Sequence, residues 1–178
     1  MITLYHGTNY SAGKSIISNK IIKNFITRRF DQHSGTPTTD GFVYLTDSLG
    51  YANYFAYDAN RNTDKSNMGY FIFKITLDEN ILLPDFDEYE FQNSINTNEI
   101  DAKNYNFRKS LDELAVCRTD NPITDENSIL EYTHINKKIT DSIGNELWLK
   151  FVHNSLSVDE NKNKYDEKIL SYLTFRKI

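Results

Sequence analysis

The residues of this chain best suited to chemistry are a histidine, a tyrosine and a glutamate, each within a short apolar segment. Apolar packing alone would not select a polar side chain at such a position, because burying one without a partner costs free energy. The residue pattern around each of the three predicts a β-strand. In chain order the three residues are His6, Tyr44 and Glu131.

His6 is followed directly by Gly7 and Thr8. A histidine at a strand end most often has a structural hydrogen-bonding role, and that interpretation stays open for His6. The glycine favours a second interpretation, ligand binding, because a residue without a Cβ atom lets a ligand approach the backbone closely. The N–H and C=O groups at Gly7 could then pair with a flat amide.

Tyr44 and Tyr54 are spaced to hold a flat ring. Tyr44 lies in an otherwise apolar strand with Thr46 two residues further on, and Tyr54 follows on the next predicted helix. Two tyrosines arranged in this way could sandwich a heterocycle, each contributing about 1 kcal/mol of stacking. Aromatic residues at helical spacing usually face a core, so core packing stays open for Tyr54.

Glu131 is the sharpest single signal, because a carboxylate within a β-type apolar run is costly unless it has a partner. One interpretation is an edge strand on which Glu131 faces water. The functional interpretation is a carboxylate that orients a sugar hydroxyl and stabilises positive charge at an anomeric carbon, as carboxylates do in glycosidic cleavage.

The composition predicts one ordinary domain. A chain of 178 residues with twelve Tyr and eleven Phe can bury a core, which argues against disorder. Cys117 is the only cysteine, and no Cys/His cluster has zinc-site spacing, so we expect neither a disulfide nor a metal. No stretch approaches the roughly 20 apolar residues of a membrane span, and the N-terminus lacks the layout of a signal peptide. We therefore expect a cytoplasmic protein without a membrane partner.

The charge is unevenly distributed. The formal net charge of -5 argues against broad electrostatic binding of nucleic acid. Residues 1–30 nevertheless contain basic residues and no acid, whereas residues 78–113 are mainly acidic. The basic end could hold an anion such as a pyrophosphate, or it could be a solvated charged surface.

The remaining pattern predicts an α+β domain without internal repeats. The tail alternates polar and apolar residues, and its segments 147–152 and 169–175 could be strands or helices. Predicted strands cover residues 1–5, 42–46, 70–77 and 128–134; predicted helices cover 12–18 with Ser11 as N-cap, 49–59 after Asp47 or Ser48, and 99–111; predicted loops cover 31–41, 60–67 and 118–127.

Three segments of the chain resemble the motifs of the ADP-ribosyltransferase superfamily. Residues 4–8 with 12–18 are similar to the first motif, and residues 41–47 with 52–54 to the second. Glu131 and Tyr132 at a strand start are similar to the third. The resemblance is closest to the diphtheria-toxin and poly(ADP-ribose) polymerase branch, which has a histidine–tyrosine–glutamate triad, and it covers roughly half of the chain.

The resemblance implies a split, mixed β-sheet flanked by helices, in a single catalytic domain of residues 1–178 that uses NAD as co-substrate and no metal. His6 would bond the adenosine ribose, and Gly7 the nicotinamide amide. Glu131 would hold the nicotinamide ribose and stabilise the transition state. The catalytic residues it implies are His6, Tyr44 and Glu131, and the NAD-binding residues are His6, Gly7, Thr8, Tyr44, Thr46 and Tyr54.

The implied reaction is transfer of a single ADP-ribose to a protein or nucleic acid. Ile129 stands where arginine-modifying relatives carry Glu or Gln, so an arginine acceptor is not expected. Small bacterial and phage relatives are often toxins or effectors, which implies an antitoxin or immunity partner and, for some, delivery into a target cell's cytosol. The loop before the strand of Glu131 is expected to contact the acceptor through Arg118, Thr119, Asp120 and Asn121.

Two other functions stay open. The first is a degenerate relative that binds ADP-ribose or another nucleotide without turnover, although an intact triad argues against it. The second is an RNA 2'-phosphotransferase, which uses an Arg-rich phosphate-binding set. The scattered arginines of this chain do not clearly supply that set; they include Arg28, Arg29, Arg61 and Arg118.

Overall fold

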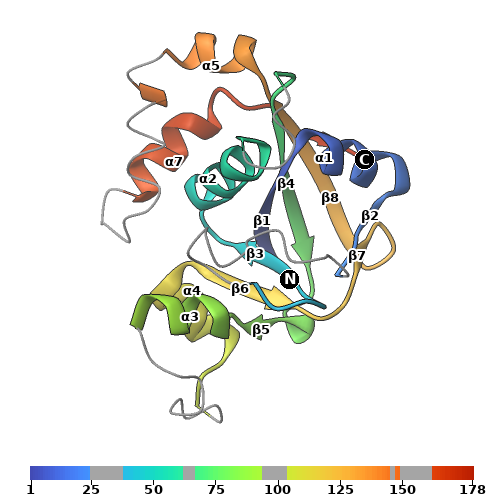
Figure 1. Cartoon of the computed structure of the whole chain (residues 1–178), viewed down its shortest axis with the longest axis vertical. Helices are drawn as coiled ribbons and strands as arrows, with labels where there is room; N and C mark the ends of the chain where they lie inside the picture. The colour runs from blue at the N-terminus through green and yellow to red at the C-terminus, as the bar shows by residue number, and fades with distance from the viewer. Residues whose placement is uncertain (25–37, 62–66, 94–103, 145–146, 149–161) are drawn as a thin grey trace.

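The computed structural model describes an α+β fold (Figure 1) over residues 1–24, 38–61, 67–93, 104–144, 147–148 and 162–178. The helices are α1 (Tyr10–Asn19), α2 (Leu49–Ala59), the 3-10 helix η2 (Glu79–Ile81), α3 (Phe86–Asn93), α4 (Phe107–Leu114), α5 (Lys137–Ile143) and α7 (Lys162–Leu170). The strands are β1 (Ile2–Asn9), β2 (Ile21–Ile22), β3 (Val43–Thr46), β4 (Tyr70–Leu77), β5 (Leu83–Pro84), β6 (Val116–Thr119), β7 (Ile123–Thr124), β8 (Ser128–Ile135) and β9 (Arg176–Lys177).

The main sheet has seven strands in the order β5-β6-β3-β1-β4-β8-β9, and β2 and β7 form a small second sheet. Strands β1 and β4 pair along eight residues, as do β4 and β8. Every pairing in the described part of the chain is antiparallel, so the expectation of a mixed sheet is wrong. Strand direction depends on where each connection crosses the sheet, and local residue patterns do not encode that.

The main sheet is split between β1 and β3. These two strands share a single register pair, Tyr5 with Thr46. Strand β3 instead pairs with β6 at four register positions. In Figure 1, β1, β4 and β8 run together, whereas β3, β6 and β5 lie across their end. The split leaves room between β1 and β3 beyond their shared pair.

Helices cover both faces of the central strands. On one face the fully buried Leu4 and Phe73 pack in the same cluster as Ile16 of α1. On the other face Ala52 and Ala56 of α2 pack with Ile72 of β4. Successive residues of a strand point to opposite faces, so each central strand contributes to both clusters.

The best-predicted elements are those with strong local signals. The strand at residues 70–77 and the helix capped by Ser48 are confirmed, and the Ser48 hydroxyl accepts the N–H of Tyr51. Strand β8 is also confirmed, one residue longer than predicted. Strand β1 is longer than predicted, because its pairing with β4 continues to Asn9. Asn9 rather than Ser11 then caps α1, by accepting the N–H of Ala12.

The acidic region was poorly predicted. It contains β5, α3 and α4, and α4 begins at Phe107 after an Asn106 cap instead of near residue 99. In the tail, α7 ends at Leu170, and β9 lies beyond the predicted apolar segment 169–175. Parts of several predictions lie outside the described residues, namely 31–37, 62–66, 99–103, 149–152, Arg28 and Arg29. Within the described helices, none has the length and apolar character needed to cross a membrane.

Candidate functional site

A cavity of about 390 Å³ lies where β1 and β3 diverge. This volume falls within the range of small-molecule sites, roughly 300–1,000 Å³. Its walls come from β1, α1, β2, residues 38–42, β3, α2 and α3. The predicted site residues that line it are His6, Gly7, Thr8, Tyr44, Thr46 and Tyr54.

His6 connects the two sides of the split. Its Nδ1 lies 2.9 Å from the carbonyl oxygen of Tyr44. A carbonyl oxygen only accepts, so Nδ1 carries the hydrogen and donates, which in the neutral ring makes Nε2 an acceptor. The half-buried imidazole therefore both ties β1 to β3 and lines the cavity.

Close packing against α2 explains why residue 7 is a glycine, and the sequence alone did not indicate this contact. A Cβ atom at this position would lie 1.8 Å from the carbonyl oxygen of Ala52. The glycine therefore lets α2 approach β1, and the space its missing side chain leaves is filled by the helix. The residue still lines the cavity, on the strand edge that faces the split.

The Tyr44 ring is fixed through its hydroxyl. The hydroxyl donates to the Asp87 carboxylate and accepts the N–H of Thr39 at 2.8 Å. Thr39 also donates its N–H and its hydroxyl to Asp87, at 2.7 and 2.8 Å. Burial, and then the bond to Asp87, raise the pKa of Tyr44, so the phenol stays neutral. These hydrogen bonds hold Thr39 and Tyr44 together in the wall of the cavity.

Thr46 and Tyr54 occupy different positions. The Thr46 hydroxyl donates to the carbonyl of Ala115 at 2.6 Å and accepts the N–H of Ser48 at 2.9 Å, so it organises the turn into α2. Tyr54 is partly exposed on α2, with its ring 5.6 Å from that of Phe55. Tyr54 is thus the more accessible of these two cavity residues.

Arg118 and Thr119 are strand residues, so the prediction that they begin a surface loop is wrong. Strand β6 extends through both because it pairs with β3 as far as Val43. The Arg118 side chain is 11% exposed; its Nη1 lies 3.3 Å from Asp87 Oδ1, and its Cζ lies 4.0 Å from the Phe42 ring centroid. Thr119 is fully buried. Asp120 and Asn121 are exposed and remain predicted acceptor contacts.

Glu131 does not line the cavity. It is in register with Lys74, which is in register with Tyr5, and its carboxylate lies 3.1 Å from Lys74 Nζ. His6 belongs to the next row of the sheet, in register with Phe73. Adjacent rows point to opposite faces, so Glu131 and His6 lie on opposite faces of the sheet. Of the predicted triad, His6 and Tyr44 therefore line the cavity and Glu131 does not.

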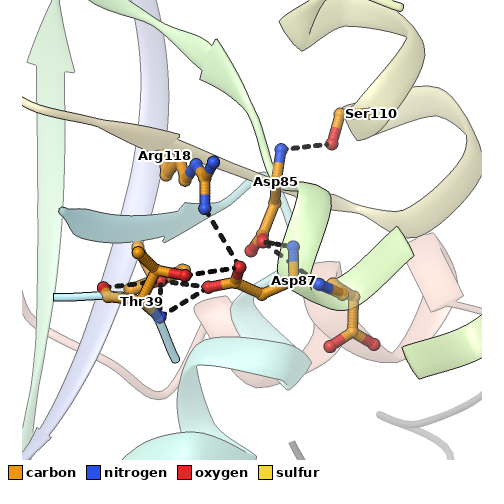
Figure 2. Close-up of polar contacts among 7 residues, drawn as sticks. Thr39, Asp85, Asp87, Ser110 and Arg118 are labelled. Carbon is orange, nitrogen blue, oxygen red and sulfur yellow. Dashed lines mark hydrogen bonds and ion pairs between the residues drawn. The ribbon is translucent and has the colours of Figure 1, made fainter. Parts of the chain in front are cut away.

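The carboxylates that do line the cavity come mainly from the start of α3, which the sequence reading missed. Asp85 accepts the N–H groups of Asp87 and Glu88, at 3.1 and 3.2 Å, as the cap of this helix, and burial raises its pKa to about 7. The Asp85 N–H donates to Ser110 at 3.0 Å (Figure 2). An aspartate directly before an acidic first turn is the helix-start signal that could have located this segment.

Glu88 differs from its two neighbours. It is 8% exposed, and Oε1 accepts a hydrogen bond from the neutral amide of Gln92 at 2.7 Å. Its other oxygen forms no hydrogen bond with the described residues and is not one of their buried unpaired atoms, so it is accessible to solvent. Burial raises the pKa of Glu88. The cavity thus has a buried carboxylate without a compensating cation.

The cavity is acidic on the α3 side, and Lys23 is the only lysine or arginine among its described lining residues. No group of His, Cys, Asp and Glu in the described ranges is arranged to hold a metal ion. Comparisons with protein-family models, curated proteins and solved structures found no match to this chain.

Proposed function

We propose that this protein is an NAD-dependent mono-ADP-ribosyltransferase, which cleaves the nicotinamide–ribose bond and transfers ADP-ribose to a protein or nucleic acid. The observation that carries the proposal is the convergence of His6, Gly7, Tyr44 and Tyr54 on one cavity at the split in the sheet. They come from two separate segments of the chain, the end of β1 and the unit formed by β3 and α2, and the proposed reaction needs both segments.

The cavity offers a partner for each part of the nicotinamide. The strand edge at Gly7 would pair with the carboxamide, and the fixed ring of Tyr44 and the accessible ring of Tyr54 would pack on the pyridinium. Stacking of this kind contributes about 0.5–1.5 kcal/mol beyond the buried area. The ring of NAD is positively charged while it is bonded to ribose, so the acidic wall formed by α3 would attract it.

One feature of the fold fits the same proposal: the strand that carries the histidine, β1, shares a single register pair with β3, and the cavity is lined by residues of both strands. Among the described residues of the basic N-terminal region, Lys23 lines the cavity and would lie toward the pyrophosphate. Under this proposal the partners are NAD, a macromolecular acceptor and, for a cytoplasmic or delivered toxin, an immunity protein.

One observation favours a second candidate, a module that binds ADP-ribose or another nucleotide without cleaving NAD. Glu131 does not line the cavity and is paired with Lys74, so the carboxylate expected to drive cleavage is not among the residues that face it. The 2'-phosphotransferase alternative gains no support from Arg118, which is buried between two phenyl rings.

The test is incubation of the protein with NAD, measuring free nicotinamide and labelled acceptor in lysate, together with NAD affinity by calorimetry. Tyr54→Ala should weaken NAD binding about 2- to 13-fold, the equivalent of the stacking term. Tyr57→Ala is the matched control, since Tyr57 is 42% exposed on the same helix and does not line the cavity. Binding without nicotinamide release would favour the nucleotide-binding module, and equal effects of the two variants would refute the assignment of the cavity.

A further inference from the structure

We propose that Glu88 supplies the carboxylate that stabilises the reacting ribose, in place of Glu131, which does not line the cavity. This inference rests on the proposed transferase function. It starts from the acidic residues that line the cavity, which are Asp40, Asp58, Asp85, Asp87 and Glu88.

Four of these five are committed elsewhere or exposed. Asp87 is fully occupied by Thr39, Tyr44 and the Arg118 cation. Asp85 is committed as the cap of α3, where its Oδ1 accepts the N–H groups of Asp87 and Glu88. The remaining two are Asp40, which is exposed, and Asp58, which is half-buried on α2 and has an interaction of its own.

Glu88 has the properties that the role requires. It is more than nine-tenths buried, lines the cavity and has one oxygen without a partner among the described residues. Within the same residues it forms no ion pair. Partial burial without a cation makes the charged form of this carboxylate less stable than in water, and perturbed groups of this kind cluster at functional sites. A cationic sugar would provide the missing charge.

Glu88 is also held in place. It lies in the first turn of α3, which the Asp85 cap fixes at its start. The neighbouring residue, Asp87, joins α3 to the hydroxyl of Tyr44. The same network therefore positions both the ring proposed to stack on nicotinamide and the carboxylate proposed to face its ribose, with Gln92 orienting the latter.

The proposed step is balanced without any further reactant. The bond between the ribose anomeric carbon and the nicotinamide nitrogen breaks, and its electron pair leaves with nicotinamide, which becomes neutral. Positive charge develops on the anomeric carbon and ring oxygen, where the Glu88 carboxylate stabilises it. The lone pair of the acceptor then forms the new bond to that carbon, and the acceptor's proton passes to solvent. Glu88 ends unchanged.

The test compares nicotinamide release by the wild-type protein with that by Glu88→Gln and Glu131→Gln. The Glu88→Gln side chain keeps the size and the acceptor for Gln92, so the fold should be retained. We expect its kcat to fall about 100-fold or more, with NAD affinity within about threefold, as for loss of a group that acts in the transition state. Glu131→Gln should release nicotinamide at the wild-type rate.

The outcomes separate the two proposals. Nicotinamide release that survives in Glu88→Gln, or is lost in Glu131→Gln, overturns the Glu88 assignment and leaves the transferase function standing. A wild-type protein that binds NAD and never releases nicotinamide overturns both. Should Glu88→Gln fail to fold, Glu88→Asp, which withdraws the carboxylate by one methylene, is the second variant: a rate equal to wild type would refute the assignment.

Discussion

Replacement of Asp85 by asparagine should make the protein more stable at neutral pH and leave it nearly unchanged in acid. Asp85 is 4% exposed and caps α3 through Oδ1, an acceptor that asparagine also provides. The substitution therefore removes the charge while keeping the cap.

The magnitude follows from the pKa of Asp85. Burial is the largest cause of its rise from 3.8 to about 7, and the nearby Asp87 carboxylate adds to it while Arg118 opposes it. Since each pKa unit is worth about 1.4 kcal/mol, the ionised carboxylate lowers stability by on the order of 4 kcal/mol. Between pH 3.8 and about 7 the folded protein keeps a proton that the unfolded chain has lost. The free energy of unfolding therefore falls as pH rises through this window.

The assay is urea unfolding at intervals from about pH 4 to pH 8, a range that brackets the window. The stability gain of Asp85→Asn over wild type should be near zero at the acidic end and grow toward neutrality. Asp112→Asn, at an exposed position on α4, is the matched control and should show no such growth. A gain that does not depend on pH, or a loss at neutral pH, would refute the reasoning and show that Asp85 is ionised in the fold.

Three further substitutions test the packing around the cavity. Gly7→Ala should destabilise the protein by about 1–3 kcal/mol, because the new methyl group would collide with the Ala52 carbonyl, and thermal unfolding would measure this; an unchanged midpoint would show that α2 can move away. Arg118→Met should lower the free energy of unfolding by about 3 kcal/mol, because it leaves the Asp87 carboxylate without its cation. The control Asp120→Asn, at an exposed position nearby, should leave stability unchanged, and equal stabilities of the two variants would contradict a stabilising Arg118–Asp87 pair. Tyr44→Phe should lower the free energy of unfolding by about 1–3 kcal/mol, because Asp87 loses the hydrogen bond from the Tyr44 hydroxyl. A stability equal to wild type in urea unfolding would show that this hydrogen bond does not stabilise the fold.

The sequence was most informative where local signals and tertiary contacts agree. The alternation in β4 and the Ser48 cap of α2 are local, and both elements were predicted correctly. The six residues proposed to bind NAD all line one cavity. They lie on β1, β3 and α2, three elements whose local patterns were identified from the sequence.

The prediction failed where the outcome depended on pairing. A one-residue change of position on a strand moves a side chain to the other face, so the apolar run around Glu131 could not show which face it occupies. Arg118 has the polar, turn-rich surroundings of a loop, yet its pairing with Tyr44 places it in a buried strand. Gly7 was correctly singled out, but its neighbour is α2, which no pattern within residues 4–8 could indicate.

The central claim is that NAD occupies the cavity at the split in the sheet. The most direct measurement is amide chemical-shift mapping with a carbocyclic NAD analogue, whose bond to nicotinamide cannot be cleaved. We expect saturable shifts at Gly7, Thr8 and Tyr54, which line the cavity, and unchanged signals at Lys74 and Glu131, which do not. Shifts confined to Lys74 and Glu131, or no shifts at millimolar analogue, would contradict the claim.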